Sequence, residues 1–297
     1  MFSPFASIIQ RVPIGAFFIL LLLVFISGSL SMFVLHTFAQ IQGIELQTLV
    51  ADFPRENTYL NRQYLRWSAI INQCGLFLIP ALAFASLARG KDWMIMLRLT
   101  KVPSAYKLLL GIVLLLCFMP IAQYAFYLNQ QLPLPGWMRS MEANANNLVN
   151  GLLVMENISE LSMNLLTIAL IPALAEEVLF RGILQQKIAD YTLRPQWAIW
   201  LAAIIFSAVH GQFEGFFARM LLGAALGYLF FWTQNLWIPI VAHLTHNGFQ
   251  VFVAYVHQDQ LPPPSPENSE PISMMFVLLC SIFVFGIGRL LYKSRHI

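Results

Sequence analysis

Two adjacent glutamates and an arginine interrupt an apolar stretch, "ALAEEVLFRGIL", at residues 173–184. Glu177 and Arg181 are four residues apart, so on a helix they share a face and can form an ion pair. Pairing makes the burial of both charges tolerable. Glu176 is rotated by about 100° from Glu177 around a helix, so its carboxylate can face a different neighbour. The spacing therefore predicts one glutamate in a supporting ion pair, and a second that is available for chemistry.

Imidazole and amide side chains in later apolar stretches complete the candidate site. His210 ends "FSAVH", and "HLTHN" places His243 and Asn247 four residues apart on one helix face. A carboxylate removed from water is a stronger base, and with an imidazole it can hold and deprotonate a water molecule. His243 and Asn247 can direct N–H donors to the point where an oxyanion develops. Glutamate, histidine and asparagine side chains in this arrangement indicate hydrolysis of an acyl bond, above all a peptide bond. His246 is interpreted as a residue without a role in this chemistry.

The same side chains leave a metal-dependent alternative open. Glu176, His210 and His243 are residue types that can ligate a divalent metal such as Zn²⁺, with a water in the fourth position. The three cysteines are isolated and form no C-x-x-C pair, so neither a cysteine zinc site nor a disulfide framework is expected. The residues require no cofactor, and a metal stays optional at this point.

The composition is that of an integral membrane protein. The chain is 58% hydrophobic and only 10% charged, with a mean hydropathy of +0.68, whereas soluble domains carry about 25% charged residues. A formal net charge of +3 is too small to indicate nucleic-acid binding. The lipid bilayer is the expected environment, and no nucleic-acid partner is expected.

Apolar runs predict an all-α, polytopic membrane protein with about eight transmembrane helices and an intramembrane polar site. Twelve of the 17 Lys and Arg residues fall on one side if both termini are cytoplasmic, as the positive-inside rule requires. This pattern is typical of a multi-pass protein of a bacterial inner (cytoplasmic) membrane. The predicted spans are about 14–38, 68–90, 105–128, 160–187, 196–212, 217–233, 237–256 and 272–292.

The spans group into four predicted regions. Residues 1–130 hold the first three helices, 131–159 form an outer loop, 160–256 form the catalytic helical core, and 257–297 form a Pro-rich outer loop and a last helix. A rise of 1.5 Å per residue places Glu176 roughly 16 Å and Asn247 roughly 15 Å from the cytoplasmic helix ends. The fourth, fifth and seventh spans can therefore bring the site together below the cytoplasmic surface.

Glycines of the sixth span bear on helix packing. Gly223 and Gly227 form a G-x-x-x-G pattern, which allows close helix approach. It either positions the neighbouring catalytic helices or reflects chance in a helix rich in small residues.

Three short motifs carry a family resemblance. "EEVLFR" (176–181) resembles the E-E-x-x-x-R motif of the CPBP family of intramembrane proteases. This family comprises the CAAX proteases and bacteriocin-processing (Abi) proteins, and is related to the Ras-converting CAAX endopeptidase. "FSAVH" (206–210) resembles its F-x-x-x-H motif and "HLTHN" (243–247) its H-x-x-x-N motif. The motifs occur in the family's order, and the resemblance covers about residues 160–255.

The resemblance implies an intramembrane endopeptidase that acts on a peptide or membrane-protein substrate. It implies that Glu176 and His210 activate water and that His243 and Asn247 form the oxyanion site. Glu177 and Arg181 are implied as supporting residues. Neither the motifs nor the resemblance specifies a substrate, a cleavage site, an oligomeric state or metal use, nor whether prenylated CaaX proteins are relevant.

Two functions of other classes stay open at the level of sequence. A non-catalytic membrane partner or immunity factor would keep the fold and the motifs while acting by binding. A proton-coupled transporter would use buried Glu and His side chains as a relay. The transporter is less favoured because the chain lacks two matching halves with interrupted helices.

Overall fold

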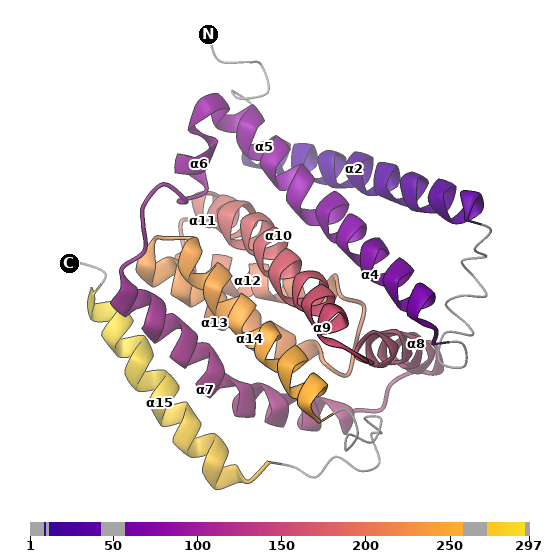
Figure 1. The fold of residues 1–297 in the computed structure, drawn as a ribbon. Helices are drawn as coiled ribbons and strands as arrows, with labels where there is room; N and C mark the ends of the chain where they lie inside the picture. The colour runs from indigo at the N-terminus through magenta and orange to yellow at the C-terminus, as the bar shows by residue number, and fades with distance from the viewer. Residues whose placement is uncertain (1–8, 10–11, 43–56, 258–271, 295–297) are drawn as a thin grey trace.

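The computed structural model describes residues 9, 12–42, 57–257 and 272–294 (Figure 1). Within these ranges every regular element is a helix, which confirms the all-α prediction. The predicted Pro-rich connector, 258–271, lies outside the described residues. The elements are α2 (Pro13–Ile41), α4 (Tyr59–Gln73), η1 (Cys74–Leu78), α5 (Ile79–Arg89), η2 (Gly90–Asp92), α6 (Trp93–Met96), α7 (Ala105–Gln130), α8 (Gly136–Leu152), α9 (Ile158–Asn164), η3 (Leu165–Leu170), α10 (Ile171–Leu179), η4 (Phe180–Gln185), α11 (Gln186–Thr192), α12 (Pro195–Ala208), α13 (Phe216–Thr233), α14 (Trp237–Val256) and α15 (Met274–Lys293).

Several helices are long and apolar enough to cross a bilayer, so the chain is an integral membrane protein. Six helical segments of the described residues meet this criterion, and the expected number of about eight was approximate. α12 has only 14 residues, and α14 carries polar site residues. The six segments are Ile14–Ile41, Tyr59–Met96, Ala105–Gln130, Ile158–Thr192, Phe216–Thr233 and Met274–Lys293.

The segment expected as an outer loop, 131–159, contains the helix α8, which lies beside the start of α9 (Figure 1). α8 has a polar composition with few long apolar runs, so hydropathy alone gave no helix there. Its tertiary contacts hold it in place, among them a hydrogen bond from the Asn57 side chain to the carbonyl of Gly151, 3.2 Å long.

A six-residue sequence, Leu-Ile-Pro-Ala-Leu-Ala, occurs at both 78–83 and 170–175. In each copy the leucine ends a π-helical turn, η1 or η3, and the isoleucine begins an α-helix, α5 or α10. Proline has no N–H, and its ring clashes with the carbonyl four residues earlier. The turn before each proline widens accordingly, and such turns are frequent at functional sites. The second copy leads directly into Glu176.

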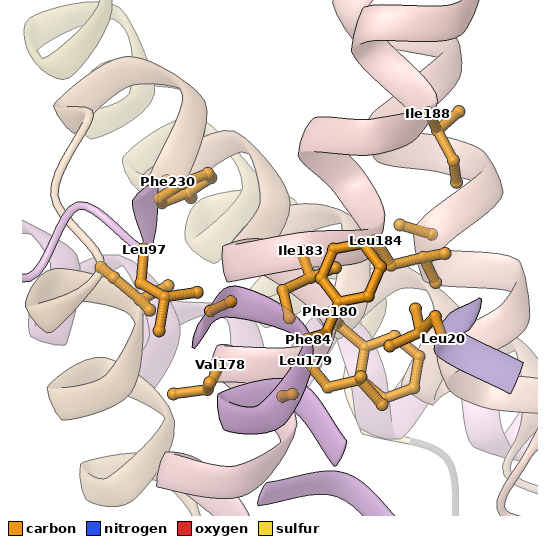
Figure 2. Close-up of a cluster of buried hydrophobic side chains, with 14 of the residues drawn as sticks. Leu20, Phe84, Leu97, Val178, Leu179, Phe180, Ile183, Leu184, Ile188 and Phe230 are labelled. Atoms are coloured by element: carbon orange, nitrogen blue, oxygen red, sulfur yellow. The ribbon is translucent and has the colours of Figure 1, made fainter. Parts of the chain in front are cut away.

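A hydrophobic cluster packs α10 and η4 against the N-terminal helices. Leu20 of α2, Phe84 of α5, and Leu179 and Phe180 at the α10–η4 junction belong to it (Figure 2). Phe84 is fully buried, and the Phe180 ring also stacks edge-on against a ring of α12. This packing fixes the backbone on which Glu176 and Glu177 stand.

A buried polar network joins α4 to α9. Glu160 accepts two hydrogen bonds from Arg62, at 2.7 and 3.0 Å, and one from Arg66 at 2.7 Å. Arg66 also donates to the Asn164 side chain at 2.7 Å. All four side chains are almost completely buried. The fixed fork of a guanidinium matches a carboxylate well, so this network sets the position of α4 along α9.

We expect Glu160→Gln to destabilise the protein strongly, because it removes the carboxylate that two buried guanidinium groups share and leaves only Arg62 a second one, that of Glu156 at 2.9 Å. Breaking a buried ion pair in this way costs about 3–5 kcal/mol. Equilibrium unfolding in mixed detergent micelles measures the change. The control is Asp190→Asn, which removes a 3.3 Å pair with Lys187 at the surface and should cost at most about 1 kcal/mol. Equal effects of the two substitutions would contradict a structural role for the network.

Candidate active site

Glu177 is the carboxylate on which three helical elements converge. Its Oε1 lies 2.7 Å from Nη1 of Arg181 and 3.0 Å from Nδ1 of His243. All three side chains are buried. The i, i+4 ion pair expected from the sequence is therefore present, and the same carboxylate also orients an imidazole of α14. This contact ties α10 to α14.

Arg181 extends the connection to α12 and α13. Its Nη2 donates to the carbonyl oxygen of Gly223 at 2.8 Å, and its guanidinium lies over the Phe206 ring, 4.9 Å from the ring centroid. One turn further on, Gln185 donates to the carbonyl of Gly227 at 3.0 Å. Both glycines of the G-x-x-x-G pattern thus present backbone acceptors to side chains of η4.

The two glycines also leave no room for a side chain. A Cβ atom on Gly223 would lie 3.1 Å from the Phe206 ring, and one on Gly227 would lie 2.9 Å from the Gln185 side chain. The pattern therefore does allow close approach, and it holds α13 against the segment that carries Arg181.

Glu176 faces away from Glu177, toward α4 and the loop after α12. Its Oε1 accepts a hydrogen bond of 2.9 Å from Nε2 of Gln73 and lies 3.9 Å from Nε2 of His210. Nδ1 of His210 is 2.7 Å from the carbonyl oxygen of Phe206, so Nδ1 carries the hydrogen. In the neutral ring Nε2 is then an acceptor. Two acceptor atoms thus face each other 3.9 Å apart.

The sequence predicted that His210 lies on a helix. It lies instead in the loop that follows α12, because this helix ends at Ala208. Gly211 has a φ of +64° and turns the chain away from helical geometry. The loop is held from outside: Glu142 of α8 accepts from the backbone N–H groups of Phe213 and Glu214, at 2.6 and 3.2 Å. The helix missed in the sequence therefore positions the loop that carries His210.

His243 and Asn247 lie together on α14. Nδ2 of Asn247 is 3.2 Å from Nε2 of His243 and 3.1 Å from the carbonyl oxygen of Ile168. Pro172, four residues after Ile168, has no N–H that could donate a hydrogen bond to that carbonyl. The side-chain amide of Asn247 donates to it instead. Both amide hydrogens are engaged, and an oxyanion would have to replace one of these two acceptors.

These side chains line a common cavity of ≈ 450 Å³. Glu176, His210, His243 and Asn247 all contribute to its wall, as do residues of α4, α7, α8 and α13. His246 lines it too, and its buried Nδ1 has no hydrogen-bond partner among the described residues. The structure thus brings the four sequence-predicted residues to one hollow, and places His246 there as well.

The side chains do not fit a three-ligand metal centre. Among the described residues no group of three His, Cys, Asp or Glu side chains is arranged to hold a metal ion. Both ring nitrogens of His243 are engaged, by Glu177 and by Asn247, and Nδ1 of His210 faces a carbonyl. The set Glu176, His210 and His243 therefore lacks the geometry of metal ligands.

A bundle of apolar helices around an enclosed carboxylate, imidazole and amide defines a class: polytopic membrane proteins with a buried polar site. Comparison with known protein families identifies a family that part of the chain resembles. Residues 158–249 match the model of the family described as "Type II CAAX prenyl endopeptidase Rce1-like". The resemblance predicted from the three motifs is confirmed over this segment, which contains all of them.

Two curated proteins of Bacillus subtilis (strain 168) are similar to parts of the chain. "Uncharacterized protein YpbD" is 33% identical over 104 residues, 33% of this chain and 50% of the relative. "Putative membrane peptidase YdiL" is 22% identical over 131 residues, 44% of this chain and 51% of the relative. The chain thus spans about half the length of the curated relatives it matches. No solved structure matches significantly.

We expect Gly223→Val to loosen the site, because the new side chain meets Phe206 and Ala203. Overpacking typically costs about 1–3 kcal/mol, and the unfolding midpoint in detergent should fall. Gly286→Val on α15 is the matched control, since a Cβ atom there meets nothing within 4 Å. A Gly223→Val protein as stable as the control would show that the close approach is dispensable.

Proposed function

We propose that this protein is an intramembrane endopeptidase that hydrolyses a peptide bond with water activated by Glu176 and His210. The observation that carries the proposal is the 3.9 Å separation of Glu176 Oε1 and His210 Nε2 at the wall of a cavity. The similarity of residues 158–249 to Rce1-like endopeptidases supports the same activity.

The 3.9 Å separation suits one bridging water. Polar atoms more than 3.5 Å apart are often joined by a water molecule, and a water about 2.8 Å from each acceptor would donate one hydrogen to each. Because Nδ1 of His210 donates to Phe206, Nε2 keeps its lone pair for this purpose. The two side chains thus orient the oxygen lone pairs of water toward the cavity.

In the proposed reaction the water oxygen attacks the carbonyl carbon of the scissile peptide bond. One water proton passes to the Glu176 carboxylate as the new C–O bond forms, and the carbonyl oxygen becomes an oxyanion. Glu176 then delivers that proton to the amide nitrogen, the C–N bond breaks, and a carboxylic acid and an amine result. No atom of the protein bonds covalently to the substrate.

His243 and Asn247 would stabilise the oxyanion. Glu177 holds Nδ1 of His243 at 3.0 Å, which fixes the orientation of the ring beside Asn247. Asn247 can redirect an N–H from Ile168 or His243 to the developing charge. Preorganised donors of this kind contribute strongly to acyl transfer, so Glu177 and Arg181 act by positioning the oxyanion site.

The proposed substrate is a peptide or membrane-protein segment that reaches the cavity within the bilayer. The proposed location is a bacterial cytoplasmic membrane with both chain termini on the cytoplasmic side, which the Lys and Arg distribution supports. Both curated relatives are bacterial proteins.

We expect Glu176→Gln and His210→Ala each to lower peptide cleavage by at least about a hundredfold, because each removes a group that moves or holds the water proton. Membranes incubated with purified protein are analysed for new N-termini by mass spectrometry. A quenched-fluorescent peptide that spans a site cut only by the wild type then gives the rates.

Asp92→Asn is the control, since it removes an exposed carboxylate and should leave cleavage unchanged. Wild-type turnover in either site variant would refute the proposed function. A cellular phenotype that survives both variants would favour a binding role, and proton-coupled uptake into liposomes would favour a transporter.

A further inference from the structure

Gln73, the last residue of α4, contacts the proposed general base directly. Its Nε2 donates to Oε1 of Glu176 at 2.9 Å, and it also lines the cavity. It lies outside residues 158–249, the segment that matches the endopeptidase family. We propose that Gln73 is a positioning residue that fixes the orientation of the Glu176 carboxylate for proton transfer. This inference rests on the proposed function.

The chemistry of the amide sets its orientation. An ionised carboxylate can only accept hydrogen bonds, so the NH₂ group and not the oxygen of Gln73 must face Glu176. The amide oxygen, Oε1, is then buried with no partner among the described residues. An unpaired buried acceptor is unfavourable, and each such case calls for an explanation. Stability alone would favour an apolar residue here, whereas a role in orienting Glu176 accounts for the amide.

The hydrogen bond restrains the torsion that matters for the reaction. The last side-chain torsion of a glutamate is broad, with no strong staggered preference. Because Gln73 donates to Oε1, this oxygen stays directed toward Nε2 of His210, 3.9 Å away. A carboxylate free to rotate would present that geometry for only part of the time.

The fold holds Gln73 itself in place from two sides. Arg62, Arg66, Ala69 and Gln73 have spacings of four, three and four residues, so they form one stripe on α4. The first two bind Glu160 through the buried network, and Ala69 and Gln73 line the cavity.

On the other side of Gln73 the chain enters η1, where α2 packs closely. The Ser27 hydroxyl donates to the carbonyl oxygen of Gly75 at 2.5 Å. A Cβ atom on Gly75 would lie 1.7 Å from the Ser31 hydroxyl oxygen, so the two backbones are in close contact. The N-terminal helices thereby become part of the proposed catalytic arrangement rather than a scaffold beside it.

The test compares Gln73→Met with Asn72→Leu. Methionine keeps the length of glutamine and removes the donor, whereas Asn72 is the neighbouring polar residue and makes no side-chain hydrogen bond with the described residues. With the quenched-fluorescent peptide, Gln73→Met should lower kcat by between about tenfold and a hundredfold, the range expected for a misplaced catalytic group. KM should stay within about twofold, and Asn72→Leu should match the wild type.

A double-mutant cycle separates positioning from a general loss of structure. In Glu176→Asp the carboxylate is one methylene shorter and moves out of reach of Gln73. Adding Gln73→Met to Glu176→Asp should then change kcat by less than about twofold, because coupled residues are not additive. Independent, multiplicative losses, or an unchanged kcat in Gln73→Met alone, would overturn the inference.

A second variant guards against a folding defect. If Gln73→Met lowers the unfolding midpoint below that of Asn72→Leu, Gln73→Asn is used, since it stays polar but cannot reach Glu176; it should show the same loss of kcat. The outcomes also separate the two proposals. Full activity of Glu176→Gln would end the proposed function, whereas an inactive Glu176→Gln with a fully active Gln73→Met would end only this inference.

Discussion

The need to pair the buried carboxylate of Glu177 organises the site. In a membrane interior an unpaired charge is very costly, so this carboxylate must find hydrogen-bond donors in its surroundings. It meets Arg181 and His243, and Arg181 in turn binds the backbone of α13 at Gly223. A single electrostatic requirement therefore places α10, α13 and α14 against one another, and Glu176, rotated by about 100° from Glu177, points into the cavity.

Prolines provide the second constraint. Pro80 and Pro172 each follow a widened turn, and the carbonyl that Pro172 cannot serve becomes an acceptor for Asn247. A residue that disturbs an ideal helix thus creates a polar anchor inside the bundle. This hydrogen bond fixes the amide beside His243.

The sequence predicted local relations well and long-range ones poorly. The Glu177–Arg181 pair and the different direction of Glu176 follow from helical periodicity, and the apolar runs predicted the helical fold. Periodicity says nothing about partners 94–103 residues away, such as Arg66 with Glu160 or Gln73 with Glu176. A polar residue inside an apolar run was the one available signal for Gln73. The helix α8 and the loop position of His210 were missed because tertiary contacts, rather than hydropathy, define them.

The repeated Leu-Ile-Pro-Ala-Leu-Ala segment separates backbone shape from chemistry. Both copies produce the same interruption followed by a fresh helix start, yet the next residue is Phe84 in one and Glu176 in the other. The residue after the identical hexapeptide is therefore an apolar core residue in the first copy and an acidic residue in the second. The chain therefore contains two copies of one helix interruption, and only the second copy is followed directly by an ionisable side chain.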